Sequence, residues 1–313
     1  MLDSVERLLR GCSTSCEQKK LLEAVYADDL NFFKEFDNKV PNEEVKTETA
    51  ACQKELHLWG EANQVAFDPS KESTHVLSRK EGEGGNFKVL GVNFDCQLLL
   101  EDAVHELVVK ANWKLRTLVR SRRYFTGAQL VQLYKAHLPS YLEYRAAALY
   151  HAASSTLEPL DKLQTRFLRE AGVSELEGLM VFNLAPLSAR RDMAMLGLIH
   201  RTVLGKGPPQ FREFFKAAET QENHPATRLF ERRHGKQLKE WKDGTHTDVV
   251  TNSALGLVTV YNLLPDYLVQ KPNVKNFQQS LQALLKQRAA ANCEDWTETF
   301  SPRLPLWRHP LRQ

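Results

Sequence analysis

The sequence lacks the segments that would place it in or across a membrane. It has no run of about eighteen apolar residues, the length that a membrane-spanning helix needs. Its first twenty residues carry charges throughout and contain no apolar signal-peptide core. The cysteines are few and odd in number: Cys12, Cys16, Cys52, Cys96 and Cys293. Because such scattered cysteines are typical of reduced thiols, we expect an intracellular protein, nuclear or cytoplasmic, with no membrane partner.

A zinc site is not favoured either. Cys12 and Cys16 could share a metal ion, but no second Cys/His pair follows at zinc-site spacing. Two ordinary thiols are the preferred interpretation.

What the chain does have is an ordinary globular composition with an uneven charge. Of its 313 residues, 42% are hydrophobic and 26% are charged, enough for two domains of usual size. Residues 1–109 carry 12 Lys/Arg against 21 Asp/Glu, whereas residues 110–233 carry 20 against 11. The middle third is therefore the best place for a surface that binds a polyanion, with solvated helix faces as the alternative explanation.

The most informative motif is Tyr26-Ala27-Asp28-Asp29. Apolar stretches that read as strands precede and follow it, so we expect the two aspartates at the tip of a hairpin. Two adjacent exposed carboxylates are a poor arrangement unless a cation lies between them. Such a pair is typical of the metal site of a nucleotidyl-transfer enzyme, although a DD pair in a polar turn is common.

The first hundred residues alternate between strand and helix patterns. A helix is expected to begin at Asn42, and strands are expected over 63–68, 71–78 and 87–94, the last one broken in its middle by Gly91. An antiparallel sheet with a crossing helix on one face accounts for this pattern.

The rest of the chain reads as helical. From Glu101 to about residue 218 we expect a bundle, with a capping box at Thr126 and Gln129, a break at Pro139 and a C-cap at Gly172. A helix over 186–204 and a short one over 210–217 follow. Residues 219–248 read as a long exposed connection, and the remainder as a small C-terminal extension. The predicted domains are thus 1–100, 101–218 and 219–313, and the fold class is α+β.

An ordered series of motifs resembles the C-terminal part of a reverse transcriptase of the non-LTR (LINE-type) retrotransposon class. After the YADD motif, the stretch from His57 to Lys71 resembles the next motif of that family, and Phe87-Lys88-Val89-Leu90-Gly91-Val92 resembles the strand that holds the primer. Residues 134–144 and 185–192 resemble the thumb, and Tyr261-Asn262-Leu263-Leu264-Pro265 resembles the tail. The resemblance covers nearly the whole chain from about residue 21.

The resemblance implies RNA-directed DNA synthesis with Mg²⁺, with RNA template, DNA primer and dNTP as partners. It implies Asp28 and Asp29 as catalytic metal ligands and Lys71 as a general acid. It also implies a truncated palm over 1–100 and a thumb-like helical domain over 101–218. Phe87, Lys88, Leu90 and Gly91 would contact the nucleic acid.

The same resemblance shows what the palm would lack. The family carries another catalytic aspartate on a strand well upstream of YADD, whereas only 25 residues precede Tyr26 here, with Asp3 as their one aspartate. Two carboxylates on one turn cannot hold two metal ions without partners from another strand. We therefore expect that this chain alone does not polymerise DNA, and its status as an enzyme stays open.

Arginines supply the candidate phosphate contacts, because guanidinium groups bind phosphates bidentately. The candidates are Arg120, Arg122, Arg123, Arg190 and Arg191; cations that favour helix ends are an equal alternative.

Three functions compete at this stage. The first is a truncated reverse transcriptase, and the second is a non-catalytic nucleic-acid-binding module or the product of a decayed element. The third, a metal-dependent hydrolase using Asp28 and Asp29, lacks a third ligand and a base and ranks last.

Overall fold

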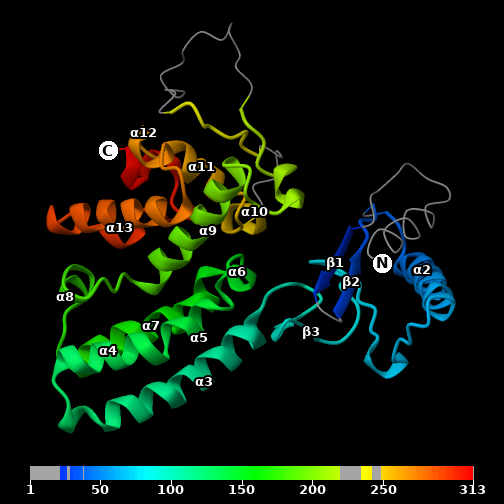
Figure 1. The fold of residues 1–313 in the computed structure, drawn as a ribbon, viewed down its shortest axis with the longest axis horizontal. Coiled ribbons are helices and arrows are strands. Elements are labelled where there is room, and N and C mark those ends of the chain that lie inside the picture. Colours follow the sequence, from blue (N-terminus) through cyan, green and yellow to red (C-terminus); the bar gives the residue numbers. More distant parts are fainter. Residues whose placement is uncertain (1–21, 27–28, 38, 219–233, 242–247, 313) are drawn as a thin grey trace, which may run out of the picture. The chain divides into compact units, whose positions relative to one another are not determined.

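The computed structural model describes residues 22–26, 29–37, 39–218, 234–241 and 248–312. The chain divides into two compact units, Met1–Leu98 and Leu99–Gln313, which Figure 1 shows and which we treat separately. The first boundary lies two residues before the expected one. The division expected after residue 218 has no counterpart, because Leu99–Gln313 forms one unit.

The first unit contains two hairpins and a long helix. Strands β1 (Leu22–Tyr26) and β2 (Asp29–Phe33) pair antiparallel, and so do β3 (Phe87–Val89) and β4 (Val92–Phe94). Helix α2 (Asn42–Ala62) lies between the hairpins in sequence and is followed by the 3₁₀ turn η1 (Pro69–Lys71). The unit is therefore mixed helix and sheet, as expected, but its described strands form two separate hairpins and not one larger sheet.

Two predicted strands of this unit are wrong. Residues 63–68 contain no strand, because Val65 N bonds back to Gly60 O in a turn that closes α2. In place of a strand over 71–78 there is η1, started by the Asp68 carboxylate that accepts from Ser70 N at 3.0 Å, and then one isolated bridge between Val76 and Glu83. Here a local hydrogen bond from the backbone to a side chain favours a turn, although the alternation of apolar residues predicted a strand.

The third prediction, a strand over 87–94, is corrected to a hairpin. Leu90 and Gly91 have φ angles of 46° and 81°, and Val89 pairs with Val92 across them. Positive φ at both central residues is the geometry of a tight two-residue hairpin turn, for which Gly91 is well suited. We expected Gly91 only to interrupt one strand, whereas it lies in the turn that reverses the chain.

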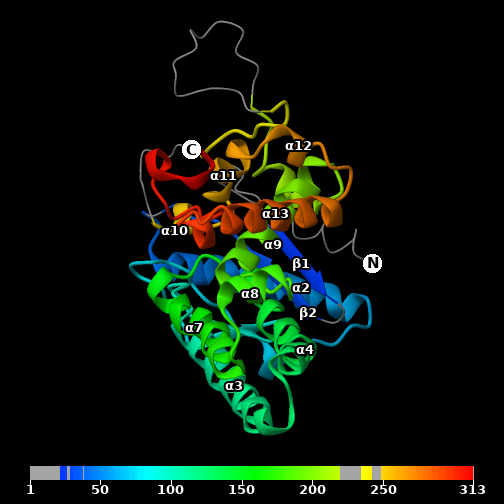
Figure 2. The ribbon, with the colours of Figure 1, turned by 90° about the vertical axis from the view of Figure 1, so that its left-hand side faces the viewer.

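The second unit is helical. Its first part consists of α3 (Glu101–Arg120), η2 (Arg122–Tyr124), α4 (Gly127–His137), α5 (Pro139–Glu143), α6 (Ala146–Leu149) and α7 (Ser154–Ala171). Both views place α3 along the lower edge of this part, and it packs against α4, α5 and α7 (Figure 1 and Figure 2). The capping box of Thr126 with Gln129, the break at Pro139 and the left-handed C-cap at Gly172 are all confirmed.

The second part is built around α9. It contains α8 (Glu175–Met180), α9 (Leu187–Val203), α10 (Asp248–Asn252), α11 (Leu257–Leu263), α12 (Asp266–Val269) and α13 (Val274–Ala290). The 3₁₀ turns are η3 (Pro209–Arg212), η4 (Trp296–Glu298), η5 (Leu306–Arg308) and η6 (Pro310–Arg312). Helix α9 contacts α6, α7, α11 and α13, so its apolar side chains lie at the centre of the main core. The helix expected over 210–217 is only the short turn η3.

The connection expected over 219–248 is corrected for residues 234–241, which pack onto this core. His234 and Leu238 are buried. The Asn262 side chain accepts from Leu238 N at 2.8 Å and donates to Leu238 O at 2.9 Å, as a paired strand would. A polar-looking stretch is thus fixed by the Asn262 amide on one side and by backbone bonds to residues 216–218 on the other.

Candidate nucleic-acid interface

The YADD motif forms the hairpin that the sequence predicts, as far as it is described. Tyr26 pairs with Asp29 at the end of the β1–β2 ladder. Asp29 is exposed, and Asp28 lies outside the described residues. The expected position of the motif at a hairpin tip is therefore confirmed for Asp29.

Helix α2 supports this hairpin from one side. Leu30 of β2 packs with Leu56, Trp59 and Phe67 in a small apolar cluster. An ion pair between Lys34 and Glu48 joins the chain just after β2 to the same helix. The hairpin thus rests on α2, which matches the expected helix on one face of a sheet.

Lys71, the expected general acid, has a different neighbour. Its ammonium lies 3.7 Å from a carboxylate oxygen of Asp68, and most of its side chain is exposed. Hydrogen bonds from Ser70 hold the pKa of Asp68 below its usual value, so that carboxylate stays charged. Within the described residues, no hydrogen bond or ion pair joins Lys71 to Asp29.

The described residues do not make a magnesium site. They contain no group of three or more His, Cys, Asp or Glu side chains placed to hold a metal ion. Asp29 supplies one exposed carboxylate, whereas a two-metal centre for phosphoryl transfer needs several converging ones. The described residues therefore supply too few ligands to hold Mg²⁺ for catalysis.

The residues expected to hold the primer lie on the β3–β4 hairpin. The Phe87 ring is stacked between His75, with ring centroids 4.4 Å apart, and Phe94, at 5.6 Å. Lys88 is exposed, and Leu90 at the turn is 44% exposed. The hairpin therefore presents Lys88, Leu90 and Gly91 outward while Phe87 anchors it.

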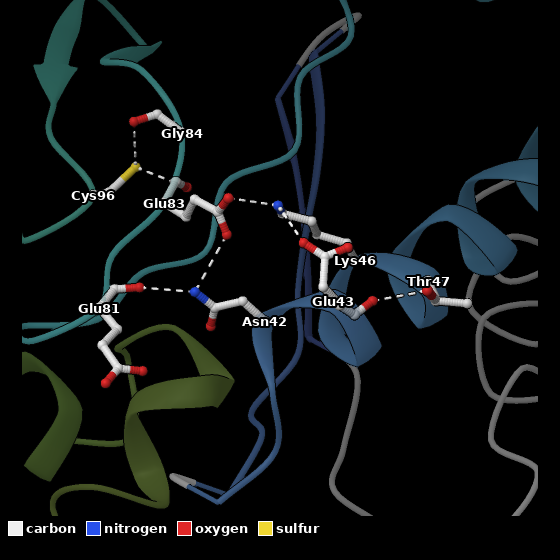
Figure 3. Close-up of polar contacts among 8 residues, drawn as sticks. All are labelled: Asn42, Glu43, Lys46, Thr47, Glu81, Glu83, Gly84 and Cys96. Atoms are coloured by element: carbon white, nitrogen blue, oxygen red, sulfur yellow. Dashed lines mark hydrogen bonds and ion pairs between the residues drawn. The ribbon is translucent and has the colours of Figure 1, made fainter.

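A network of polar contacts ties the chain before this hairpin to α2 (Figure 3). Asn42 Nδ2 donates to Glu81 O at 3.1 Å, and Lys46 Nζ lies 2.6 Å from Glu83 Oε1. The Cys96 thiol donates to the carbonyls of Glu83 and Gly84, and burial raises its pKa. Lys46 also pairs with Glu43, so its charge is already balanced by two carboxylates.

The five candidate arginines of the second unit fall into different environments. Arg191 is 6% exposed, and its two terminal nitrogens each lie 2.7 Å from an oxygen of Asp161 on α7. Arg190 pairs with Glu143, and Arg122 pairs with Glu170. A guanidinium committed in this way holds helices together, so Arg191 in particular does not lie open to a phosphate.

Arg120 and Arg123 remain open at the end of α3. Arg120 is exposed and has no ion pair with another described residue. Arg123 is exposed and lies over the ring of Tyr124, with its Cζ 4.8 Å from the centroid. Of the five candidate arginines, these two are therefore the ones open to a polyanion.

The structure adds residues that the sequence analysis did not name. Trp113 is 71% exposed on α3, and Arg116 is exposed one turn further on. Together with the two open arginines they form what we call the α3 surface: Trp113, Arg116, Arg120, Arg123 and Tyr124. The apolar stripe of α3 contained the signal, because Trp113 falls opposite the positions of Leu107, Ala111 and Leu118 on the helix.

A small pocket near the start of α9 offers no comparable site. Its volume is about 180 Å³, and four of its polar lining residues are Asp161, Gln164, Thr165 and Glu175. Asp161 is paired with Arg191, Glu175 accepts from Thr165, and Gln164 bonds Tyr134 and Ala185. The polar side chains therefore already have partners.

In the described residues, no helix is long and apolar enough to cross a bilayer. The sequence matches no family model, and neither a curated protein nor a solved structure matches it. The resemblance to non-LTR reverse transcriptases thus stays a prediction that rests on the motif series.

Proposed function

We propose that this chain is a fragment of a reverse transcriptase of the non-LTR retrotransposon class. It binds nucleic acid but does not polymerise DNA by itself. The carrying observation is the α3 surface, where three exposed cations accompany two exposed aromatic rings. RNA template and DNA primer are the partners that the motif series implies.

Charge along α3 supports this proposal. The acidic residues Glu101, Asp102 and Glu106 lie in its first two turns, whereas Arg116 and Arg120 lie in its last two. The alternative is that the arginines only complement the helix dipole. That alternative does not require Arg123, which lies beyond the helix, to point into solvent.

The absence of catalysis by the chain alone is supported by the carboxylates of the described residues. Among the described residues, no two further metal-ligating side chains are grouped with Asp29, and Lys71 is paired with Asp68. An upstream strand carrying another aspartate would be needed to complete the polymerase site. Until such a strand is added, the hydrolase alternative lacks its ligands for the same reason.

A salt titration tests the binding proposal. Affinity for a labelled duplex should fall steeply with salt, because bound cations release counterions from the phosphates, with a slope of about −0.9 per phosphate contact. In the Arg120→Gln/Arg123→Gln variant the slope should become shallower by about 2. The Lys275→Gln/Arg308→Gln variant removes two exposed cations elsewhere in the unit and should keep the wild-type slope.

No binding at low salt would overturn the proposal and favour the product of a decayed element. An equal loss of slope in both variants would show that only net charge matters.

A further inference from the structure

Trp113 is the largest exposed side chain on α3, and helix geometry makes its exposure inherent to the fold. Ala111 and Leu115 on either side of it are buried, as are Leu107 and Leu118. Turning Trp113 inward would turn this apolar stripe outward. The indole therefore lies on the solvent face with no place in the core.

The neighbours of Trp113 on that face are mainly cationic. Arg116 follows one turn later, and Arg120 follows about 10 Å along the axis, as seven residues of helix rise require. Neither arginine has an ion pair with another residue in the described ranges. Val109, about one turn before Trp113, is also exposed.

The end of the helix continues the same pattern. Arg123 lies over the Tyr124 ring, and Tyr124 is as exposed as Trp113. Two exposed rings and three exposed guanidinium groups thus lie within residues 113–124. Large contiguous apolar patches mark many surfaces that bind another protein, whereas here the exposed rings are separated by charged side chains.

This inference rests on the proposed nucleic-acid binding. We propose that the α3 surface binds single-stranded nucleic acid, with a base stacked on Trp113 and phosphates bound by Arg116, Arg120 and Arg123. Unpaired bases have free faces for an aromatic ring, whereas the bases of a duplex are already stacked on each other. A duplex could use only the arginines of this surface. The tryptophan therefore adds affinity for single strands alone.

The test compares binding of a fluorescein-labelled 12-nucleotide single strand and of the matching blunt duplex to the full chain at equal salt. Trp113→Ala should weaken single-strand binding by about 5- to 150-fold, the range that corresponds to ~1–3 kcal/mol per stacked base. Duplex affinity and the salt slope of single-strand binding should stay at wild-type values. Trp113→Phe should restore most of the affinity, because a phenyl ring still stacks.

Trp307→Ala is the matched control. Trp307 is 77% exposed in the same unit and is also followed by an arginine, so its loss removes an equally exposed indole without touching α3. It should bind the single strand as the wild type does.

The outcomes separate this inference from the proposed function. If single strand and duplex bind equally and Trp113→Ala changes neither, the stacking site is refuted while nucleic-acid binding stands. If neither probe binds at low salt, the proposed function itself fails. Equal losses in Trp113→Ala and Trp307→Ala would also overturn the inference.

Discussion

The two units of this chain differ in where they keep their apolar residues. In Leu99–Gln313 one cluster contains 23 buried residues, centred on α9, α11 and α13. In Met1–Leu98 the described cluster beside the YADD hairpin has a single buried member, Leu56. In the unit that carries YADD and FKVLGV, the described residues thus include few buried apolar side chains: Val45, Cys52, Leu56, Val92 and Cys96.

The short motifs that resemble a known family and the packing that stabilises the fold are therefore different features of this chain. Short motifs such as YADD and FKVLGV lie on hairpins whose outward residues are set by chemistry and not by packing. The second unit shows few such motifs, yet its packing fixes which arginines are structural and which remain open. Changes in the second unit should therefore have the larger effects on stability.

Truncation of the main core should have the largest effect. Phe277 is fully buried and stacks on His200 with centroids 4.1 Å apart. Phe277→Ala should lower the free energy of unfolding by about 3–5 kcal/mol, because it leaves a large cavity. Urea denaturation with hydrogen exchange measures it. Leu56→Ala should instead speed exchange in the first unit only; equal exchange in both units would refute the separation.

The two neighbouring arginines of α9 should differ next. Arg191→Gln should destabilise the chain by about 3 kcal/mol, since it leaves Asp161 without the buried partner that it contacts through two bonds. Arg190→Gln should cost less than about 1 kcal/mol, because its ion pair with Glu143 is more exposed. Urea midpoints of the two variants test this, and equal midpoints would contradict the assigned burial.

The pH dependence of stability should depend on Asp192. Burial raises the pKa of Asp192 to about 7, and the carboxyl bonds Tyr150 Oη at 2.7 Å. The folded state therefore keeps a proton that the unfolded state releases above about pH 4, so this group adds stability as the pH falls from 7.

Buried histidines act in the opposite direction. Burial lowers the pKa of His309 to about 4 and also lowers the pKa of His200 and of His234. The unfolded state takes up their protons first, so their contribution to stability is lost as the pH falls below about 6.5.

Replacing Asp192 should reveal the loss of stability that the buried histidines cause at low pH. Relative to the wild type, Asp192→Asn should lose about 2 kcal/mol between pH 7 and pH 5. Urea denaturation at several pH values measures it. Parallel curves for the two proteins would show that Asp192 is ionised normally in the fold.

A local effect, smaller than that of Arg191→Gln, should come from the docked segment at residues 234–241. Asn262→Ala removes the two hydrogen bonds to Leu238 and should cost about 1–2 kcal/mol. Hydrogen exchange should speed up at Leu238 N, with little change at the buried amides of α13. Unchanged exchange at Leu238 would mean that the burial of its side chain and the backbone bonds to residues 216–218 hold the segment without Asn262.

Sequence reasoning succeeded where structure is local. Four correct predictions each depend on a few adjacent residues. They are the hairpin with Asp29 at its tip, the capping box of Thr126, the break at Pro139 and the left-handed C-cap at Gly172. Their chemistry can be read without knowing what packs on them.

It failed where a distant residue decides. Arg191 is structural because Asp161, thirty positions earlier, faces it. Residues 234–241 are packed because Asn262 and the backbone of residues 216–218 bond to them. Leu90 gave no sign of adopting a left-handed conformation. The exposed Trp113, by contrast, could have been found from the apolar stripe of α3.

The central claim is that this chain binds nucleic acid without polymerising it. Its most direct test is primer extension by the full chain with template, dNTPs and Mg²⁺, at protein concentrations where binding is saturated. The account predicts bound template and no extended primer. Template-dependent extension that Asp29→Ala abolishes would contradict it.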